Sequence, residues 1–209
     1  MASSIETTST TTTLKNNGNT YMSVDTDDIV ALTNPLPLAS GGTGSALGAA
    51  SGSIAQVAFA KLTTSGTSAA LIPADDTIPQ NTEGEEILTL AITPKSATST
   101  LIISVDTNLR ENSNSAGGGV LCALFRDSTA DAVAANFGTG RADSGAYAGM
   151  EGALLQMSTS VSAASTSETT FKLRVGGEQA GTYRWNGGFG SRKLGGVMTT
   201  SITIYEVLA

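Results

Sequence analysis

The side chains best suited to ligand recognition lie in the stretch TYRWNGGFGSRK, residues 182–193, which contains the only Trp of the chain. Flat aromatic rings beside Arg and Asn side chains are typical of sugar recognition, because rings stack on apolar sugar faces while polar groups bind the hydroxyls. If this stretch is extended, Tyr183 and Trp185 lie on one side and Arg184 on the other. The alternative interpretation is that Trp185 anchors a core between sheets or between subunits. The candidate ligand-binding residues are Tyr183, Arg184, Trp185, Asn186, Phe189 and Arg192.

Acid–base chemistry has few candidates in this sequence. The acidic pair Asp75-Asp76 and the acids of residues 83–86 are adjacent to one another in turn-rich segments. A glycosidase needs two carboxyl groups held roughly 5 to 9 Å apart in a cleft, whereas adjacent acids in turns are ordinarily solvated. The chain has no His, which removes the usual general base and the commonest metal ligand. Asp25, Asp27 and Asp28 could hold a hard cation, but they lack the Gly and distal Glu of a calcium loop, which favours a hairpin turn. We therefore predict a protein that is not an enzyme, with no catalytic residue, no metal and no cofactor.

The composition excludes several classes of partner. Charged residues make up 14% of the chain, well below the usual quarter, and the net charge is -7 with 11 scattered Lys and Arg residues. Without a basic patch we expect no nucleic acid as partner, and an anionic membrane surface is disfavoured for the same reason. The longest apolar-leaning stretch is broken by Gly and Ser, so we expect no membrane insertion. The single Cys122 lies among apolar residues and is predicted to be a buried structural thiol.

Alternating apolar residues predict an all-β fold. Residues 78–105 indicate two strands separated by residues 93–99, where Pro94 ends the first strand and a Ser/Thr cluster makes the reversal. Strands are also predicted over 54–64, with Val57 and Phe59 on one side, and over 169–175, with Phe171 inward and Lys172 outward. About eight such strands without a convincing helix favour a jelly-roll-like β-sandwich. The strand of residues 120–126 is apolar on both faces, which predicts one face in the core and the other against a neighbouring subunit.

The chain divides into three parts by composition. Residues 1–13 are almost entirely Ser and Thr, and we expect them to be a disordered arm unless a partner holds them. Residues 14–52 indicate a stem, made of a β-hairpin or meander and a Gly/Ser-rich linker, and residues 53–209 form the C-terminal sandwich head. A lone hairpin of this size is marginal in water, so the stem is expected to pack against copies of itself or to dock on another protein.

Several motifs follow one another in a recognisable order along the chain. The segment Pro-Leu-Pro-Leu-Ala-Ser-Gly-Gly-Thr-Gly follows a Leu-Lys-Asn-Asn-Gly-Asn-Thr-Tyr hairpin. This arrangement resembles the stem-to-head junctions of bacteriophage tail fibre proteins. The later segments 75–84 and 92–97 look like a C-terminal domain found in such fibres and in other phage structural proteins. The resemblance implies a homotrimeric, β-rich fibre or spike with a host-binding tip.

Three functions are consistent with this sequence. The first is a virion structural protein of the tail fibre type, made in the host cytoplasm, that binds other tail or capsid proteins through residues 1–52 and a host surface glycan or protein through a trimeric head. The second is a decoration or connector protein that contacts only other virion proteins. The third is a polysaccharide depolymerase tailspike, against which the absence of His and of a repetitive solenoid both weigh.

Overall fold

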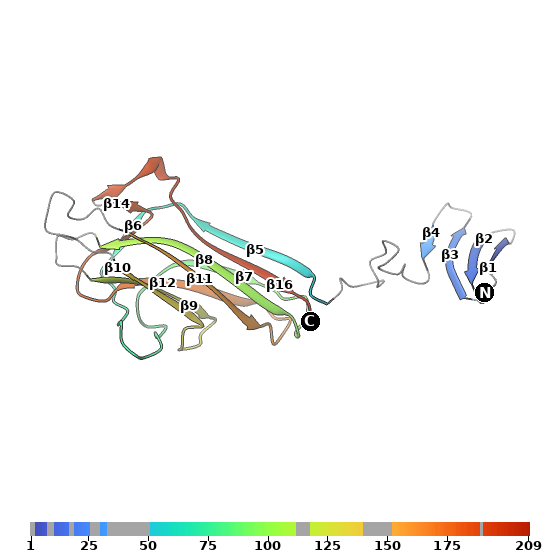
Figure 1. Ribbon diagram of the computed structural model, residues 1–209, viewed down its shortest axis with the longest axis horizontal. Coiled ribbons are helices and arrows are strands. Elements are labelled where there is room, and N and C mark those ends of the chain that lie inside the picture. Colours follow the sequence, from blue (N-terminus) through green and yellow to red (C-terminus); the bar gives the residue numbers. More distant parts are fainter. Residues whose placement is uncertain are drawn as a thin grey trace. The chain divides into compact units, whose positions relative to one another are not determined.

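The chain consists of two units, residues Met1–Ser53 and Ile54–Ala209 (Figure 1). The computed structural model describes the strands within residues 3–32 and residues 51–111, 118–139, 152–188 and 190–209. In these parts of the chain almost all regular structure is strand, and the one helical element is the 3-10 turn η2 (Leu194–Gly196). The all-β prediction is confirmed.

The first unit is a four-stranded antiparallel sheet in chain order. Its strands are β1 (Ser3–Thr7), β2 (Thr11–Asn16), β3 (Asn19–Asp25) and β4 (Val30–Leu32). β2 ends at Asn16, which is paired with Asn19 at the start of β3, as expected from the Asn- and Gly-rich sequence between them. Part of the segment expected to be a disordered or partner-held arm instead forms β1 and the start of β2. The meander therefore begins about ten residues earlier than the alternation of apolar residues indicates.

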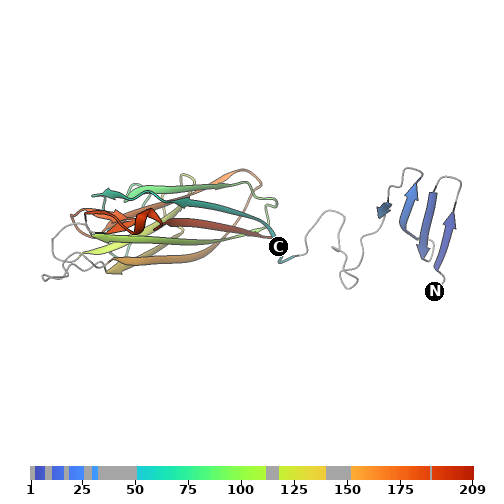
Figure 2. The ribbon, with the colours of Figure 1, turned by 90° about the horizontal axis from the view of Figure 1, so that it is seen from above.

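The second unit is a sandwich of two antiparallel sheets, seen from two directions in Figures 1 and 2. One sheet has the order β10-β9-β12-β7, and the other has the order β5-β16-β8, with β11 on the far edge of β8. Short strands β13 and β6 extend the second sheet beyond β16, and β14 and β15 form a small hairpin. The bounds are β5 (Ile54–Leu62), β6 (Gly66–Ser68), β7 (Glu85–Ile92), β8 (Thr100–Glu111), β9 (Gly119–Arg126), β10 (Ala134–Thr139), β11 (Ala153–Ser162), β12 (Thr169–Gly177), β13 (Tyr183–Trp185), β14 (Gly187–Gly188), β15 (Ser191–Arg192) and β16 (Thr200–Val207).

The core lies between the two sheets, where the inward positions of the long strands meet. Phe171 on β12 and Ile103 on β8 are both fully buried, and Lys172 is half-buried on the other side of β12, as its alternation predicts. β5 contacts β7 at one side of the sandwich and β10 contacts β11 at the other, so the sheets close together along both edges. Most of the buried apolar side chains form one cluster: Ile92, Leu101, Ile103, Val105, Leu109, Val120, Cys122, Leu124, Leu155, Ala163, Phe171, Leu173, Val175, Tyr183, Ile202 and Ile204.

The segment of residues 93–99 joins the two sheets. β7 pairs with β12, while β8 pairs with β16 and β11, so the two strands of the predicted 78–105 region are consecutive but not partners. The sequence correctly places the two strands and the reversal at Pro94. It does not distinguish a hairpin from an arch between layers, because both need the same turn residues.

A buried carboxylate holds this arch. Glu206 on β16 is fully buried, and its carboxylate accepts hydrogen bonds from the backbone N–H of Lys95 at 2.7 Å, the N–H of Ser96 at 3.0 Å and Gln56 Nε2 at 2.6 Å. Burial acts to raise the pKa of Glu206, but these donors outweigh it, so the pKa lies below its usual value of 4.5. The arch therefore depends on an ionised side chain from a strand more than a hundred residues later.

Replacing Glu206 with Gln is expected to lower the free energy of unfolding by about 2 kcal/mol at neutral pH, because an amide cannot accept from all three donors. A lowered pKa gives stability that is complete above pH 4.5 and is lost as the pH falls below it. The variant should therefore lose part of the acid sensitivity of the wild type. Urea unfolding from pH 7 to pH 3 measures both effects, with Glu168→Gln in an exposed turn as the matched control. Equal pH profiles for wild type and Glu206→Gln would contradict this assignment.

The second apolar face of β9 is covered by the chain itself. Leu121, Ala123 and Phe125 form a separate buried cluster with Ile72, which comes from the long segment between β6 and β7. Ile72 is held there because its N–H donates to the carbonyl oxygen of Gly177 at 3.0 Å. This corrects the prediction that the second face of β9 packs against a neighbouring subunit. The apolar pattern shows that both faces are buried, but not what buries them.

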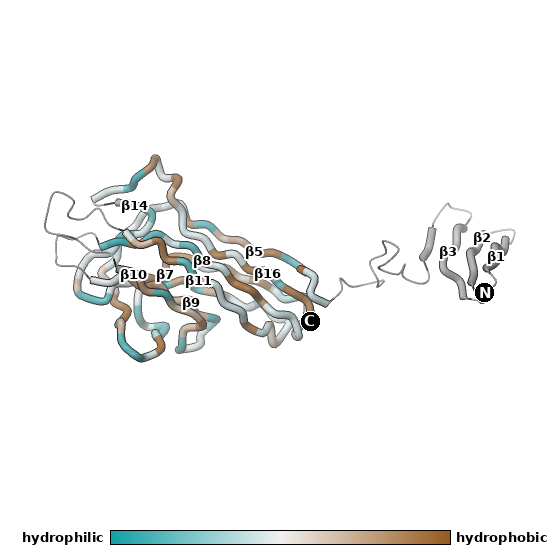
Figure 3. The backbone as a smooth tube through the Cα atoms, viewed as in Figure 1, coloured by the Kyte–Doolittle hydropathy of each residue, from teal (hydrophilic) through white to brown (hydrophobic). Residues whose placement is uncertain are grey.

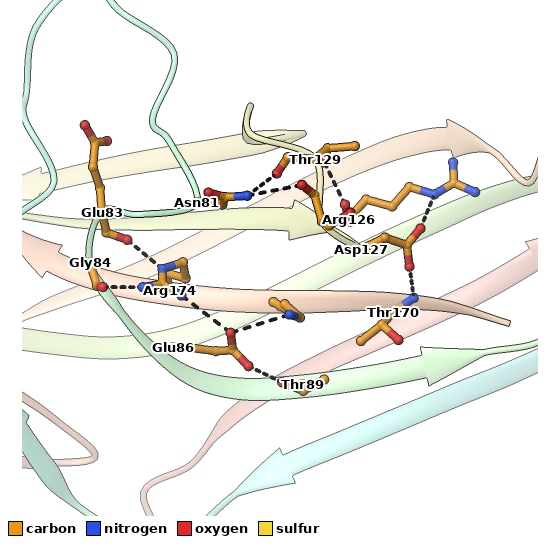
Figure 4. Close-up of polar contacts among 12 residues, drawn as sticks. Asn81, Glu83, Gly84, Glu86, Thr89, Arg126, Asp127, Thr129, Thr170 and Arg174 are labelled. Atoms are coloured by element: carbon orange, nitrogen blue, oxygen red, sulfur yellow. Dashed lines mark hydrogen bonds and ion pairs between the residues drawn. The ribbon is translucent and has the colours of Figure 1, made fainter.

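Hydrogen bonds also hold the segment between β6 and β7 at its end nearest β7 (Figure 4). Arg174 on β12 donates from Nε to the carbonyl oxygen of Glu83 at 2.6 Å and from Nη2 to that of Gly84 at 2.8 Å. Asn81 donates from Nδ2 to the carbonyl oxygen of Thr129 at 2.9 Å. The segment is therefore a fixed outer layer over the β10-β9-β12-β7 sheet.

Candidate binding surfaces

The aromatic residues of the 182–193 stretch are part of the fold's interior. Tyr183 on β13 is 1% exposed, its ring lies against Gly177, and its hydroxyl donates to the carbonyl oxygen of Gln179. Burial raises the pKa of Tyr183, against the effect of the bond to Gln179. Trp185 packs on the same core cluster, and its ring lies against Gly66 of the adjacent strand β6. The two rings share one side of β13, as predicted, but that side faces inward.

The polar residues of this stretch are divided between interior and surface. Asn186 is fully buried, so neither it nor Tyr183 is available to a sugar, which corrects the prediction for these two residues. Arg184 is half-buried, and its Nη1 donates to Ser65 Oγ at 3.1 Å. Arg192 on β15 is exposed, and Phe189 lies outside the described residues. The structure therefore divides the five described candidates between the interior and the surface, and the core-anchor alternative describes Trp185 better.

Asn186 closes a gap in the second sheet. β5 stops at Leu62 and β6 begins at Gly66, and Asn186 Nδ2 donates to the carbonyl oxygens of Leu62 at 2.9 Å and Thr64 at 3.3 Å. Its Oδ1 accepts from the Thr200 hydroxyl at 3.1 Å. The backbone of Asn186 has φ of 50°, a conformation that Asn tolerates better than most residues. Asn186 is thus the single residue that turns the chain from β13 into β14.

Asn186→Ala is expected to destabilise the second unit by about 3 kcal/mol, because two carbonyl groups and a hydroxyl lose their partner and Ala adopts positive φ poorly. Asn186→Gly removes the same hydrogen bonds but relieves the backbone, so its cost should be smaller by about 1 kcal/mol. Thermal and urea unfolding of both variants test this. If both variants unfold like the wild type, the buried amide has no role in closing the gap.

Asp75 and Glu86, from the two acidic clusters, form contacts within the fold. Asp75 Oδ1 accepts from the N–H of Thr77 at 2.9 Å and from its hydroxyl, which hold the pKa of this exposed carboxyl below its usual value. Glu86 is bonded by Thr89 Oγ1 at 3.0 Å and lies 3.5 Å from Arg174 Nη1 (Figure 4). No group of three or more His, Cys, Asp or Glu side chains within the described ranges is placed to hold a metal ion.

Cys122 on β9 is fully buried in the core, as predicted. Burial raises the pKa of its thiol to about 12, against the effect of a backbone hydrogen bond at Asn136. A thiol with so high a pKa is almost entirely protonated at neutral pH and is a poor nucleophile.

The outer face of the β5-β16-β8 sheet carries an exposed apolar surface, which we call the β5 face. Phe59 is 59% exposed and Val57 is 54% exposed, and both point away from the core, so the side they share is the outer side. Register places Tyr205 of β16 between Val57 and Ile102 of β8. Figure 3 shows apolar residues along β5, interrupted by polar ones. The β5 face consists of Ile54, Val57, Phe59, Ile102, Tyr205 and Val207.

Few charges interrupt this face. Where β5, β16, β8 and β11 run side by side, between Thr100 and Asp106 of β8, the charged residues at outward positions are Lys61 and Asp106. Both lie opposite Ser201, at one end of the region. The remaining outward positions beside the apolar residues are Ser, Thr and Gln, such as Thr203 and Ser104. Desolvating such a surface costs little, because no unpaired charge leaves water.

The sequence predicts which side chains of β5 share a side, but not whether that side faces the core or the solvent. The alternation over residues 54–62 places Val57 and Phe59 together, and a strand with apolar residues on one side is ordinarily oriented with that side inward. In the structure the inward positions of β5 are taken by small residues such as Ala58, which packs on the core cluster. Only the pairing of β5 with β16 reveals which side is exposed.

Comparison with known proteins identifies the family of the second unit. The family model described as the Pgp3 C-terminal domain matches residues 63–209, which is more than half of the chain. A search of curated proteins gives no match. Within the described parts of the chain, no helix has the length and apolar character needed to cross a membrane.

Solved structures resemble the chain only weakly. Dimeric latent PorU from Porphyromonas gingivalis is 12% identical, with a TM-score of 0.39, and the match covers 77% of this chain and 14% of PorU. A chain of infectious bursal disease virus, Gt strain, is 16% identical with a TM-score of 0.35, over 95% of this chain and 48% of the viral chain. This chain thus spans about one seventh of PorU and about half of the viral chain. TM-scores this low do not support any inference about function. On the strength of the family-model match over residues 63–209, the chain belongs to the Pgp3 C-terminal domain family.

Proposed function

We propose that the protein is a homotrimeric attachment protein of a virion, of the tail fibre type, with the sandwich unit as its head and the N-terminal sheet as its stem. The observation that carries the proposal is the β5 face, an apolar and charge-poor surface on the outside of an otherwise complete sandwich. Phe59 and Val57 are each more than half exposed on it. Contiguous exposed apolar patches on soluble domains mark interaction sites, and oligomers bury such patches against identical copies.

A second copy of the chain is the partner that fits the β5 face best. Lys61 and Asp106 lie together at one end of the face, and their opposite charges allow a copy to pair with a copy, whereas a strongly charged partner would find no complement. The number of copies, three, comes from the resemblance to tail fibres. Trimerisation also suits attachment, because weak sites repeated on one head and on several fibres add up to useful avidity.

The stem is proposed to dock on other virion proteins through residues 1–52. Its four strands form one sheet, and a single small sheet has little capacity to bury a core of its own. Docking or association with other stems supplies the missing partner surface.

Adsorption measurements test the attachment function. Purified full-length protein is expected to bind host cells and to compete with virions for them, and virions that lack it should adsorb poorly. If the protein binds no host cells and virions without it adsorb normally, the attachment function is excluded. A decoration or connector role predicts that second result together with weakened virion assembly.

A further inference from the structure

A groove lies on the side of the sandwich away from the β5 face, between β10 and residues 73–79. It consists of two adjoining hollows, one of about 420 Å³ and one of about 350 Å³, which share the side chains of Asp75, Thr77, Pro79 and Ala135. The wall on the loop side is fixed, because Asn81 and Arg174 fasten the same segment to the sheet. The groove is therefore part of the folded head rather than a gap between mobile loops.

The larger hollow contains an aromatic ring that the fold leaves accessible. Phe137 on β10 is 48% exposed, and its ring lies against Gly119 of β9, where an added Cβ would be 2.1 Å from it. A glycine at this position lets the ring lie close to the backbone, so its position is set by the sheet. Aromatic rings held in this way provide the apolar platform on which the C–H face of a sugar ring stacks.

Polar groups surround the ring at the sides of the same hollow. Asp75 and Glu178 supply carboxylates, and each is oriented by a hydrogen bond, from the N–H of Thr77 at 2.9 Å and from the N–H of Gly119 at 3.0 Å respectively. Asn136 does not add a free amide, because its Nδ2 donates to the carbonyl oxygen of Gln156 and its Oδ1 accepts from the N–H of Phe137 at 2.8 Å. A carboxylate has acceptor capacity beyond one or two bonds, so Asp75 and Glu178 can also accept from ligand hydroxyls.

The charge of the lining limits the class of ligand. Among the described residues that line the two hollows, Asp75, Asp76 and Glu178 are acidic and none is Lys or Arg. An acidic ligand, such as a sialylated or phosphorylated glycan, would bring its negative charge beside these carboxylates without a cation to offset it. An aromatic platform matches the apolar face of a neutral sugar, and carboxylate acceptors match its hydroxyl groups.

We propose that this groove binds a neutral oligosaccharide, with one sugar ring stacked on Phe137 and a second unit in the adjoining hollow. The inference rests on the attachment function proposed above, since it names the class of host molecule that the head recognises. The sequence predicts sugar recognition at Tyr183 and Asn186, which are buried. The present proposal places it in the outer layer over β9 and β10.

A glycan array of neutral, sialylated and sulfated glycans, probed with the full-length protein, tests the proposal. Binding is expected to be confined to neutral glycans of two or more units. Phe137→Ala should weaken binding of the best neutral glycan at least about tenfold, which is the effect expected for removing a central aromatic contact. Val197→Ala, at a site 77% exposed and outside the groove, is the matched control and should bind like the wild type.

A second variant separates loss of binding from loss of folding. Asp75→Asn, at an exposed position, removes a carboxylate while leaving the core intact, and should weaken the same glycan about threefold to tenfold with an unchanged melting temperature. The proposal is overturned if no glycan binds, if acidic glycans bind best, or if both variants bind like the wild type. Because adsorption is measured separately, cell binding that survives Phe137→Ala unchanged refutes the groove but not attachment. Groove-dependent glycan binding without adsorption to cells supports the groove and refutes attachment.

Discussion

Gly177→Ala is expected to destabilise the second unit severely, because the added methyl group meets a buried aromatic ring. A Cβ at Gly177 would lie 1.6 Å from Cζ of Tyr183, a ring that is itself 1% exposed and has no space to move into. The backbone cannot shift freely either, because the Gly177 N–H donates to Ala70 at 3.2 Å and its carbonyl accepts from Ile72 at 3.0 Å. We expect a loss of about 3 kcal/mol or more, near the upper end for overpacking of a core.

The control for this prediction is the nearby Gly118, where an added Cβ meets its nearest atom at 3.5 Å, an ordinary contact distance. Gly118→Ala should change the free energy of unfolding by less than about 1 kcal/mol. Combining Gly177→Ala with Tyr183→Ala should cost less than the sum of the two single changes, because the clash disappears with the ring. Urea unfolding of the four variants measures this coupling. Strict additivity would show that the ring and Gly177 are not in contact.

Phe59→Glu is expected to prevent assembly of the protein while leaving the fold of the sandwich intact. Phe59 is 59% exposed in the single chain, so a charge at this position does not disturb the core. In the proposed trimer it would bury an unpaired carboxylate, at a cost of several kcal/mol per subunit contact. Sedimentation velocity should therefore show a single chain for the variant where the wild type sediments as a trimer.

Ile78→Glu is the matched control, because Ile78 is 56% exposed but lies on the segment beside β10, away from the β5 face. It should sediment like the wild type, and circular dichroism should show native strand content for both variants. If Phe59→Glu sediments like the wild type, the β5 face is not the interface between copies.

The sequence predicts those parts of the fold that depend on local alternation. Phe171 and Lys172 are assigned to the correct sides of β12, and the reversal at Pro94 is found, because strand period and turn chemistry are local properties. Which side of β5 faces the core is not predictable in this way. The sequence pattern separates the two sides of the strand, and only the pairing of β5 with β16 decides which of them contacts the core.

Contacts between distant segments account for the other differences. Ile72 covers the outer face of β9, and Glu206 accepts hydrogen bonds from the arch at Lys95. The sequence around these two residues does not indicate which distant segment each of them contacts. The placement of Tyr183 on Gly177 and of Phe137 on Gly119 depends on which glycine the sheet brings beneath each ring. The sequence points to Tyr183 for recognition, which the fold buries, and contains no signal for Phe137, which the fold leaves 48% exposed.

The most direct test of the proposed assembly is the native mass of the unmodified full-length protein, measured by light scattering over a range of concentrations. A trimer of 21.0 kDa chains gives about 63 kDa, and this mass should persist on dilution. A mass of 21.0 kDa at every concentration would mean that the β5 face is open to solvent, and would contradict the trimeric attachment head.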